Sequence, residues 1–456
     1  MDLYGPLLAK VLFPTFEAVR GRPTLGLLEY LHTTERWSIE QLRDLQLGLL
    51  RRLLRHAYLH TTYYRDVMDR ADLRPEDINS VDDLARLPLL DRDGVRDSAE
   101  TRISDAPPYV AITKRSSGTS TGVATEVKYN HESRHWRDAS RWRGYGWSGY
   151  QMGQRAFHYW GFGPPVTSWF KRTKANLDHA LKRDMFVDCT PRSDEALTAA
   201  VKQLRGYKPQ VIVAYAAGAA ALARFVNRKN LRDWKDIPVI VGAERLWPED
   251  RVEIARAFGP AFETYGAREV QLMGAECEAH DGLHVSMEML ILETIVREKN
   301  GTIRAAKPGE SGEVVVTDLH NLASPMIRYV IGDMATAREY KVCSCGRSLT
   351  RIGPIDGRIT DTLSDGSGNA VGGLVFNILF ALIESETKQF QVYQRADTGM
   401  EVRLVLADGV KELSQKTTGK IAEWIGKYLP GVKHEIKILD EIPLTSAGKR
   451  RVVIKE

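Results

Sequence analysis

Short β-rich runs alternate with helical patterns through residues 108–356, and this alternation constrains the fold more than any other feature of the sequence. Strand-like apolar runs occupy 211–215, 237–243 and 312–319, and a helical pattern covers 248–258. Parallel strands need long crossover connections, which helices usually supply. The alternation therefore predicts βαβ units and a layered α/β domain.

A helical lead-in precedes this region, from Ser38 to about Asp97. Its apolar residues recur at intervals of three and four, and Ser38 with Gln41 forms a capping box at its start. We expect helices here and assign no chemical role to them. The recurring apolar positions include Leu42, Leu45, Leu49 and Leu53.

The composition changes after Gly357 to a stretch rich in Gly and Asp. Strand-like runs follow at 390–393 and 401–406, with a helical pattern at 412–428 and a basic tail. About a hundred residues after a glycine-rich hinge are enough for a small domain of mixed helix and strand.

The length of 456 residues is more than one domain usually takes, since domains average roughly 100–200 residues. The predicted fold class is α/β. A large N-terminal α/β domain of layered sheets and helices is expected at 1–356, with the helical lead-in as its residues 1–107. A small mobile α+β domain is expected at 357–456.

The composition excludes several classes of protein. With 43% apolar and 27% charged residues, the chain is neither disordered nor collagen-like. Lys and Arg number 64 against 59 acidic residues, and a net charge of +5 on this length predicts neither a nucleic-acid nor a membrane partner.

We expect neither a membrane-spanning segment nor a signal peptide from the sequence. The apolar windows at 211–223 and 374–383 fall short of the ~20 residues that span a bilayer. The N-terminus lacks the basic region and apolar run of a signal peptide. Four cysteines argue against a disulfide framework and for a reducing compartment or metal binding. We therefore expect a soluble, cytoplasmic protein.

The first candidate for chemistry is a run of Ser, Thr and Gly at 116–123. Seven of its eight residues are of these types, so backbone N–H groups and hydroxyls are available to hold a phosphate. It lacks the Walker pattern. A flexible surface loop is the alternative interpretation of the run.

A second candidate is Lys449, which follows Pro443 and precedes a run of basic residues. A lysine held after a turn can place its charge on a phosphate during transfer. A solvated basic tail is the alternative.

Two further motifs carry an aromatic ring or a carboxylate. Tyr265 could stack on a base, and Glu269 could hold Mg²⁺ beside phosphates. Asp333 follows a glycine turn at the end of an apolar run, where a carboxylate can bond ribose hydroxyls. A buried Tyr, a surface Glu and a turn Asp are the alternatives.

The order of the motifs is informative. The Ser/Thr/Gly run is followed by Tyr-Gly-x-x-Glu, Arg-Tyr-x-x-Gly-Asp, Gly-Arg-x-x-Asp and Pro-x-Thr-x-x-Gly-Lys. In this series the chain resembles the adenylate-forming superfamily from about Trp37 to Arg451. It is most similar to the branch of phenylacetate-CoA ligases and CapK-like proteins, as are the stretches 50–68, 83–97, 276–285 and 342–347.

The resemblance implies a two-step reaction. A carboxylate, expected to be aromatic, attacks the α-phosphate of ATP to give an acyl-adenylate and pyrophosphate, and the thiol of coenzyme A then displaces AMP. The same adenylation with an amine or alcohol acceptor stays open. A second alternative also stays open: the chain could be a catalytically idle interaction protein that binds a nucleotide and is stabilised by zinc. We expect no nucleic-acid partner. The sequence contains no feature that indicates an oligomeric state.

The resemblance also implies roles for individual residues. The phosphates of ATP would be held by Ser116, Ser117, Gly118, Thr119, Thr121 and Gly122. The adenine and ribose side would be formed by Gly242, Ala243, Glu244, Tyr265, Gly266, Asp333 and Arg358. Glu269 would bind Mg²⁺, and Lys449 would reach the α-phosphate from the small domain and then swing away. The sequence departs from the family in the spacing of the phosphate loop and in Thr360 at the hinge.

The acid would enter a pocket with aromatic walls, formed by Tyr159, Trp160, Phe162, Tyr215, Gly242 and Ala267. The stretch 131–165 interleaves arginine with aromatic residues, and Arg134, Arg137 and Arg141 share one helical face. Stacking and charge could bind single-stranded nucleic acid. We favour a solvated face with aromatic residues packed beneath it.

The cysteines match a zinc site of this branch. Cys277, His284, Cys343 and Cys345 would supply four ligands, and a closed tetrahedral set implies a structural role. His280 is the rival of His284, and Cys189 is left as a bystander.

Overall fold

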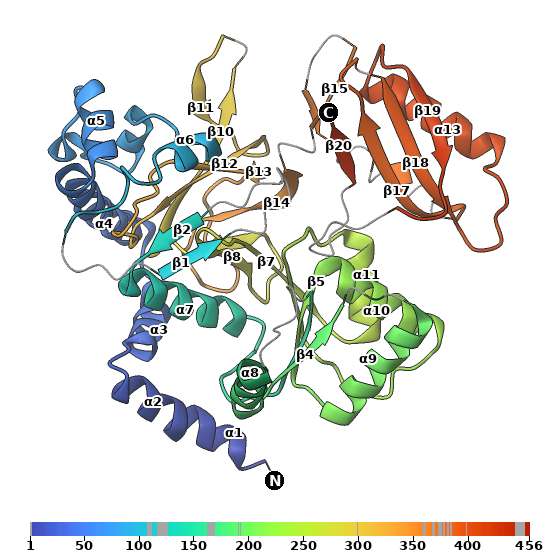
Figure 1. The fold of residues 1–456 in the computed structure, drawn as a ribbon, viewed down its shortest axis with the longest axis horizontal. Coiled ribbons are helices and arrows are strands. Elements are labelled where there is room, and N and C mark those ends of the chain that lie inside the picture. The colour runs from blue at the N-terminus through green and yellow to red at the C-terminus, as the bar shows by residue number, and fades with distance from the viewer. Residues whose placement is uncertain are drawn as a thin grey trace.

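A twelve-stranded mixed sheet forms the body of the protein in the computed structural model (Figure 1). Its strand order is β11-β10-β12-β13-β14-β9-β8-β7-β6-β5-β3-β4. The structure describes residues 2–106, 112–115, 126–161, 169–189, 191, 193–298, 300–358, 362–366, 370–372, 376, 379–380, 383, 385–397, 399–442 and 452–456.

The helices are α1 (Tyr4–Leu7), α2 (Phe13–Val19), α3 (Thr24–Thr34), α4 (Ile39–His60), α5 (Thr62–Arg70), α6 (Arg92–Asp97), α7 (His131–Gly146), α8 (Trp169–Lys182), α9 (Asp194–Tyr207), α10 (Ala216–Arg228), α11 (Pro248–Ala257) and α13 (Gln415–Tyr428). A π-helical turn, Leu8–Leu12, joins α1 to α2, and short 3₁₀ helices span Pro75–Asp77 and Asp82–Arg86.

The strands of the large sheet are β3 (Ala156–Trp160), β4 (Asp184–Asp188), β5 (Val211–Tyr215), β6 (Val239–Gly242), β7 (Ala261–Ala267), β8 (Gln271–Glu276), β9 (Leu283–Val285), β10 (Leu290–Arg297), β11 (Ile303–Ala305), β12 (Ser311–Asp318), β13 (Tyr329–Ala337) and β14 (Arg351–Arg358). Smaller sheets pair β1 (Ile112–Arg115) with β2 (Glu126–Tyr129) and β15 (Thr362–Ser364) with β16 (Ala370–Gly372). The fourth sheet holds β17 (Thr387–Gln394), β18 (Met400–Leu406), β19 (His434–Ile438) and β20 (Val453–Lys455).

The predicted βαβ region is confirmed as a parallel half of the large sheet. Strands β4, β3, β5, β6 and β7 run parallel, with α10 between β5 and β6 and α11 between β6 and β7. The run at 211–215 is β5, and the helix expected at 248–258 is α11. Apolar side chains of α9, α10 and α11 pack on this half in one core with β3, β5 and β6.

The helical lead-in packs on the antiparallel half. Helix α4 begins after Ser38, and the predicted capping box with Gln41 is present. Buried leucines of α4 share a core with Ile291 of β10 and with the segment after β12. The helical lead-in is thus fixed to the strands that carry the later motifs.

The C-terminal residues form a sheet of their own, in the order β19-β18-β17-β20, with α13 packed in the same core (Figure 1). Both predicted strands and the predicted helix of this region are present. The expected α/β fold class is therefore confirmed. The domain boundary after residue 356 stays a prediction. Strand β14 of the large sheet continues to Arg358.

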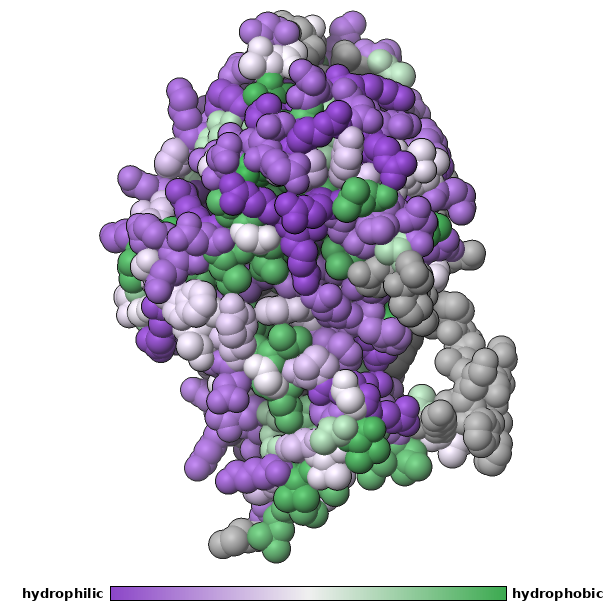
Figure 2. All heavy atoms as spheres, turned by 90° about the vertical axis from the view of Figure 1, so that its left-hand side faces the viewer, coloured by the Kyte–Doolittle hydropathy of each residue, from purple (hydrophilic) through white to green (hydrophobic). Residues whose placement is uncertain are grey.

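Apolar side chains are exposed along α1, the π turn and α2, at the start of the helical lead-in. They gather at the foot of the molecule in Figure 2 and comprise Leu3, Leu7, Val11, Leu12, Phe16 and Val19. Among the residues that the structure describes, no helix is long and apolar enough to cross a membrane.

One sequence expectation about α7 is wrong. Arg137 does not lie on a solvated face with Arg134, because its side chain is buried and donates to Asp318 at 2.6 Å. Asp318 ends β12, far away in the sequence, so the local pattern of charges around Arg137 contained no sign of this ion pair.

Candidate active site

The carboxyl ends of the parallel strands bring several predicted residues into one row. The registers pair Tyr159 with Ala214 and Tyr215 with Gly242, so Trp160, Tyr215 and Gly242 end adjacent strands β3, β5 and β6. The rings of Trp160 and Tyr215 lie 4.2 Å apart. Ligands of open parallel sheets bind outside these strand ends, so this row is the candidate site for a substrate.

The Thr264 side chain on the neighbouring strand β7 crowds the end of β6. A Cβ atom on Gly242 would lie 2.6 Å from the Thr264 hydroxyl, so any larger residue would force the Thr264 side chain to move. Ala243 follows with a φ of 66°, and Glu244 accepts a hydrogen bond from the backbone N–H of Ala217 at 3.1 Å. The carboxylate therefore caps the N-terminus of α10, where the helix dipole favours a negative charge.

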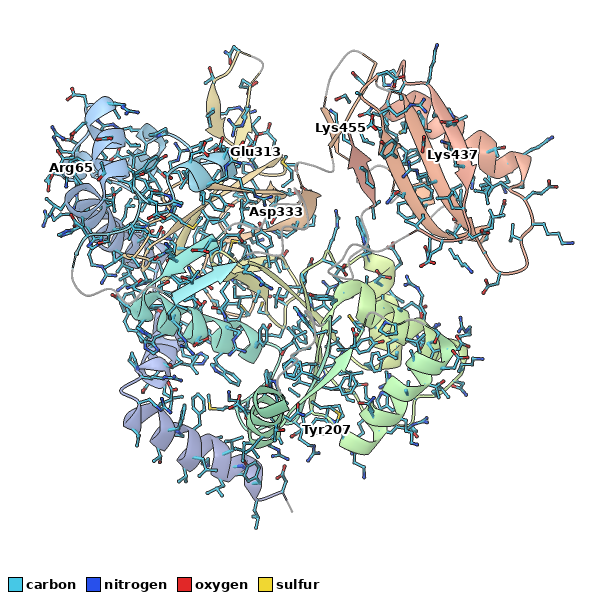
Figure 3. All side chains as sticks on the ribbon, in the orientation of Figure 1. Arg65, Tyr207, Glu313, Asp333, Lys437 and Lys455 are labelled. Atoms are coloured by element: carbon cyan, nitrogen blue, oxygen red, sulfur yellow. The ribbon has the colours of Figure 1, made fainter. Side chains whose placement is uncertain are left out.

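Two of the predicted nucleotide residues are in direct contact. The hydroxyl of Tyr265 on β7 donates to the Asp333 carboxylate on β13 at 2.9 Å. Gly266 stands at a bulge, where a Cβ would collide with the carbonyl of Gln271. In Figure 3, Asp333 lies near the centre of the molecule, on the side of the large sheet toward the four-stranded sheet.

Glu269 follows β7 and is suited to hold a cation. Its side chain is only 6% exposed, and it has no hydrogen-bond or ion-pair partner among the described residues. A buried carboxylate without a partner is costly unless a cation reaches it.

Several predicted residues cannot be placed. The β13–β14 register sets Arg358 directly opposite Asp333 in backbone terms, but its side chain lies outside the described residues. The same holds for every atom of Ser116, Ser117, Gly118, Thr119, Thr121, Gly122, Phe162, Thr360 and Lys449. Their roles stay predictions.

The remaining predicted pocket residues differ in exposure. Ala267, at the end of β7, is half-buried, as are Trp160 and Tyr215. Tyr159 is buried in the core of the parallel half, where Gly218 of α10 approaches it. Its place in an acyl pocket stays a prediction.

Two residues without an assigned role also reach the site. Tyr329 begins β13, four residues before Asp333, and its hydroxyl is buried. Arg92 begins α6 in the helical lead-in, and its charge acts on the Tyr329 phenol. Tyr329 belongs to the Arg-Tyr-x-x-Gly-Asp motif and could have been singled out, whereas no local pattern marked Arg92.

A separate cluster brings together the four predicted zinc ligands. The ligand atoms of Cys277, His284, Cys343 and Cys345 all lie within 4.8 Å of one another. The sulfur atoms of Cys277 and Cys343 are 3.8 Å apart, and the Cys345 sulfur is 3.5 Å from Nε2 of His284. These spacings fit a tetrahedral ion with Zn–S and Zn–N distances of about 2.3 and 2.0 Å.

The contacts around the cluster identify His284, and not His280, as the histidine that faces the cysteines. Nδ1 of His284 faces the carbonyl of Leu349 at 3.4 Å, which leaves Nε2 toward the cysteines. Burial lowers the pKa of His284 to about 4, so the ring is neutral, as a zinc ligand must be. His280 instead contacts Glu276 and Arg251, each at 3.3 Å, and lies outside the cluster.

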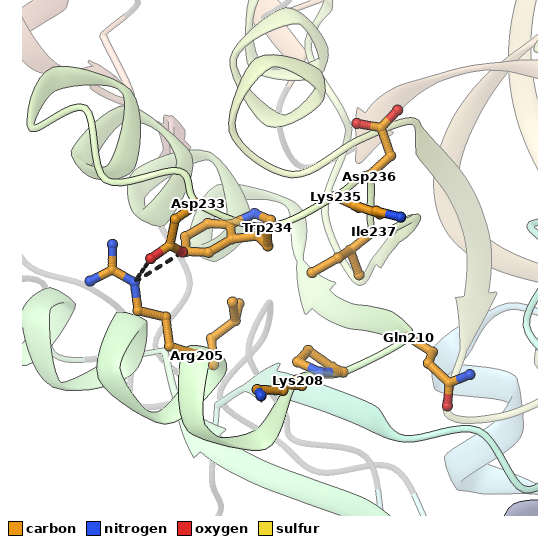
Figure 4. A pocket seen from close by; sticks show the side chains of 10 residues that line it. Arg205, Lys208, Gln210, Asp233, Trp234, Lys235, Asp236 and Ile237 are labelled. Carbon is orange, nitrogen blue, oxygen red and sulfur yellow. Dashed lines mark hydrogen bonds and ion pairs between the residues drawn. The ribbon is translucent and has the colours of Figure 1, made fainter. Parts of the chain in front are cut away.

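A cavity of about 650 Å³ lies elsewhere, between the end of α9 and the segment before β6 (Figure 4). Trp234 lines it, and Arg205 pairs there with Asp233 at 3.0 Å. It opens at the amino ends of β5 and β6, the edge opposite to the candidate site, and we place no catalytic residue in it.

No family model matches the chain. The chain is 26% identical to the phenylacetate-coenzyme A ligase of Thermus thermophilus over 443 residues, which cover 91% of this chain and 96% of the relative. It is also 22% identical to the protein CapK of Staphylococcus aureus over 264 residues, or 57% of this chain and 56% of CapK.

Among solved structures, the 2-hydroxyisobutyryl-CoA ligase in its postadenylation state matches with a TM-score of 0.72 at 18% identity, covering 92% of this chain and 91% of the ligase. The same ligase in its thioesterification state matches with a TM-score of 0.57 over equal coverage. The chain therefore has the fold of an adenylate-forming ligase. Its resemblance to the phenylacetate-CoA ligase and CapK-like branch is confirmed.

Proposed function

We propose that this chain is an ATP-dependent acid–thiol ligase of the AMP-forming type. It activates a carboxylic acid as an acyl-adenylate, releases pyrophosphate and transfers the acyl group to the thiol of coenzyme A. The observation that carries the proposal is the contact of Tyr265 with Asp333, together with the action of both Glu269 and Asp333 on the Tyr329 phenol. The sequence relatives named as phenylacetate-CoA ligases support the same reaction.

Each residue of this group has a distinct task. The Tyr265 ring packs against adenine, and its hydroxyl holds the Asp333 carboxylate in position for the ribose hydroxyls. Glu269 is the ligand for Mg²⁺, and the metal supplies positive charge at the phosphates when it is bound. The acid is already a nucleophile as its carboxylate, so no general base is required. Catalysis consists of positioning and charge stabilisation.

The two half-reactions need different neighbours for the α-phosphate. In adenylation the acid oxygen bonds to phosphorus while the bond to the pyrophosphate oxygen breaks, and Lys449 of the small domain stabilises the charge. In thioester formation the thiol of coenzyme A gives up its proton and its sulfur bonds to the acyl carbon. The bond from that carbon to the phosphate oxygen breaks and AMP leaves, so Lys449 must withdraw to admit the thiol. The two TM-scores against one ligase in two states support a small domain that changes position.

The four-residue cluster holds Zn²⁺ in a structural role. Three cysteines and one histidine form a closed ligand set, which leaves no position for a substrate. The cluster joins the β8–β9 segment to the loop before β14. Metal analysis of the purified protein should find one zinc ion per chain.

The proposal also covers the identity of the acid and of the group that accepts the acyl chain. The half-buried rings of Trp160 and Tyr215 favour an aromatic acid. An amine or alcohol acceptor would use the same adenylation residues, and product masses with coenzyme A and with candidate amines would distinguish them. A cytoplasmic location stays a prediction.

The decisive experiment is acid-dependent exchange of labelled pyrophosphate into ATP over a panel of aromatic and aliphatic acids. The wild type should catalyse exchange with at least one acid. Lys449→Ala should abolish exchange yet still convert a preformed acyl-adenylate to the thioester. A panel without any exchange would favour an idle nucleotide-binding protein, and an unimpaired Lys449→Ala variant would remove Lys449 from the mechanism.

A further inference from the structure

The helical lead-in is joined to the strand that carries Asp333. The backbone N–H of Leu90 donates to Arg328 at 2.9 Å, and Val330 donates to Leu90 at 2.8 Å, so Leu90 pairs beside the start of β13. The chain then turns into α6, where Asp91 caps the helix through the N–H of Gly94 at 2.7 Å. Arg92 is therefore held at a defined place beside β13.

Arg92 points toward the glycine that precedes Asp333. Its Nη2 atom lies 3.9 Å from the position that a Cβ atom on Gly332 would take, and Gly332 has a φ of 90°. A side chain at this position would fill the space in front of the guanidinium. Arg92 forms no ion pair with any residue that the structure describes, although its helix neighbour Arg96 pairs with both Asp93 and Asp97.

The hydroxyl of Tyr329 is buried close to Arg92. The residue is 0% exposed. Its hydroxyl oxygen faces the Arg92 guanidinium, but no described residue makes a hydrogen bond of standard geometry with it. Buried polar groups almost always have a well-formed hydrogen bond, so we expect a ligand or bound water to complete the partners of this hydroxyl. Burial raises the pKa of Tyr329 to about 12, with Glu269 acting in the same direction and Arg92 against it. The phenol is thus a neutral donor.

The charges around this point identify the class of ligand. Glu269 and Asp333 bring two carboxylates close to Tyr329, and both act on its phenol. A polyphosphate beside two carboxylates needs positive charge close by, and an arginine fork suits phosphate oxygens. Arg92 and the Tyr329 hydroxyl supply a cation and a neutral donor between the proposed Mg²⁺ ligand and the ribose-binding residue.

We propose that Arg92 and Tyr329 form a phosphate-binding pair, supplied in part by the helical lead-in, that contacts the phosphate chain of ATP. This inference rests on the proposed function, because it assigns the nucleotide to the group around Asp333. It gives the helical lead-in a direct part in substrate binding, in addition to its packing against the sheet.

The test compares ATP with adenosine, which has no phosphate. Arg92→Gln should raise the Kd for ATP at least tenfold, measured by calorimetry on the full chain. The Kd for adenosine, measured by saturation-transfer NMR, should not change. Arg92→Lys should recover part of the loss, and Tyr329→Phe should raise the Kd for ATP three- to tenfold. Arg96→Gln is the matched control on the same helix and should bind ATP as the wild type does.

If Arg92 contacts a phosphate, ATP binding should depend less on salt in the Arg92→Gln variant. The Kd for ATP should rise less steeply with salt in Arg92→Gln than in the wild type, because one phosphate contact is gone. Unchanged ATP binding in Arg92→Gln, or an equal loss of adenosine binding, would overturn the phosphate-binding pair. If the wild type exchanges pyrophosphate and Arg92→Gln does so at the same KM for ATP, only this inference fails. A wild type that binds no ATP would remove the proposed function as well.

Discussion

Glu263 is a buried carboxyl group whose titration affects the stability of the fold. It lies on β7, is 9% exposed and accepts a hydrogen bond from the backbone N–H of Leu246 at 3.2 Å. Burial raises the pKa of Glu263 to about 7. The Leu246 hydrogen bond opposes that rise, and the Glu276 carboxylate adds to it. Its charge is therefore unfavourable in the folded protein at neutral pH.

We predict that Glu263→Gln removes a pH-dependent loss of stability. The folded carboxyl keeps its proton up to a pH of about 7, whereas the unfolded one releases it near the ordinary glutamate pKa of 4.5. Between these values the folded state binds more protons, so the free energy of unfolding falls as pH rises through this window. At ~1.4 kcal/mol per pKa unit, the wild type should lose roughly 3 kcal/mol relative to the variant between pH 4 and 8.

Urea unfolding of both proteins at several pH values measures this difference. Glu249→Gln, an exposed change at the start of α11, is the matched control and should leave the wild-type pH profile unaltered. Parallel profiles for the wild type and Glu263→Gln would show that Glu263 titrates normally.

Helix α7 is fixed to the rest of the fold by buried charges. Arg143 donates to both oxygens of Glu288, at 2.7 and 2.9 Å, and neither side chain is exposed. Glu288 also accepts from Thr34 of α3 at 2.5 Å, and Arg143 donates to the carbonyl of Leu31 at 3.1 Å. One ion pair thus connects α3, α7 and the segment before β10.

We predict that Arg143→Met lowers the free energy of unfolding by about 3–5 kcal/mol, because it leaves the Glu288 carboxylate buried without its cation. The double variant Arg143→Met/Glu288→Gln should recover much of this loss, since its amide can still accept from Thr34. Arg134→Met, at a half-buried site on the same helix where the arginine pairs, among the described residues, only with Asp138 at 3.8 Å, should change stability by about 0.5 kcal/mol or less. Denaturant unfolding of all three tests this, and additive losses in the double variant would contradict it.

Elements with a strong local pattern could be predicted from the sequence, whereas contacts between distant segments could not. The cap at Ser38 and the apolar run of β5 are properties of neighbouring residues, and both are present as expected. The buried state of Arg137 depends on Asp318, and that of Arg143 on Glu288, both far along the chain. A helical pattern shows which arginines share a face but not which counter-ion the fold brings to it.

The residues of the candidate site also fall into those that the sequence could predict and those that it could not. Tyr265, Glu269 and Asp333 stand in short motifs, so the residues themselves carried the prediction. The choice of His284 over His280 needed the β8–β9 pairing, which turns only one of them toward the cysteines. Arg92 reaches the site through the pairing of Leu90 with β13, and this contact between segments more than two hundred residues apart leaves no local pattern.

On the scale of the whole molecule, the cluster of Cys277, His284, Cys343 and Cys345 also connects to the N-terminal helices. The backbone N–H of Ser348 donates to the carbonyl of Glu35 at 3.0 Å, and Arg347 donates to the Glu35 carboxylate at 3.1 Å. The Trp147 indole donates to the same carboxylate at 3.1 Å, and its ring lies 5.5 Å from His284. The loop that carries two of the ligands is thus fastened to the end of α3 and to α7.

We therefore predict that removing zinc loosens two distant segments together. A strong chelator should increase hydrogen exchange in the loop at 338–350 and also in the α3 segment at 24–37, because both depend on the same anchor. The melting temperature should fall by roughly 5 °C or more, at ~2–4 °C per kcal/mol for a sizeable domain. In a Cys343→Ser/Cys345→Ser variant both segments should exchange fast already, and the chelator should have no effect. Faster exchange in the loop with an unchanged α3 would mean that Glu35 holds the helix independently of the metal.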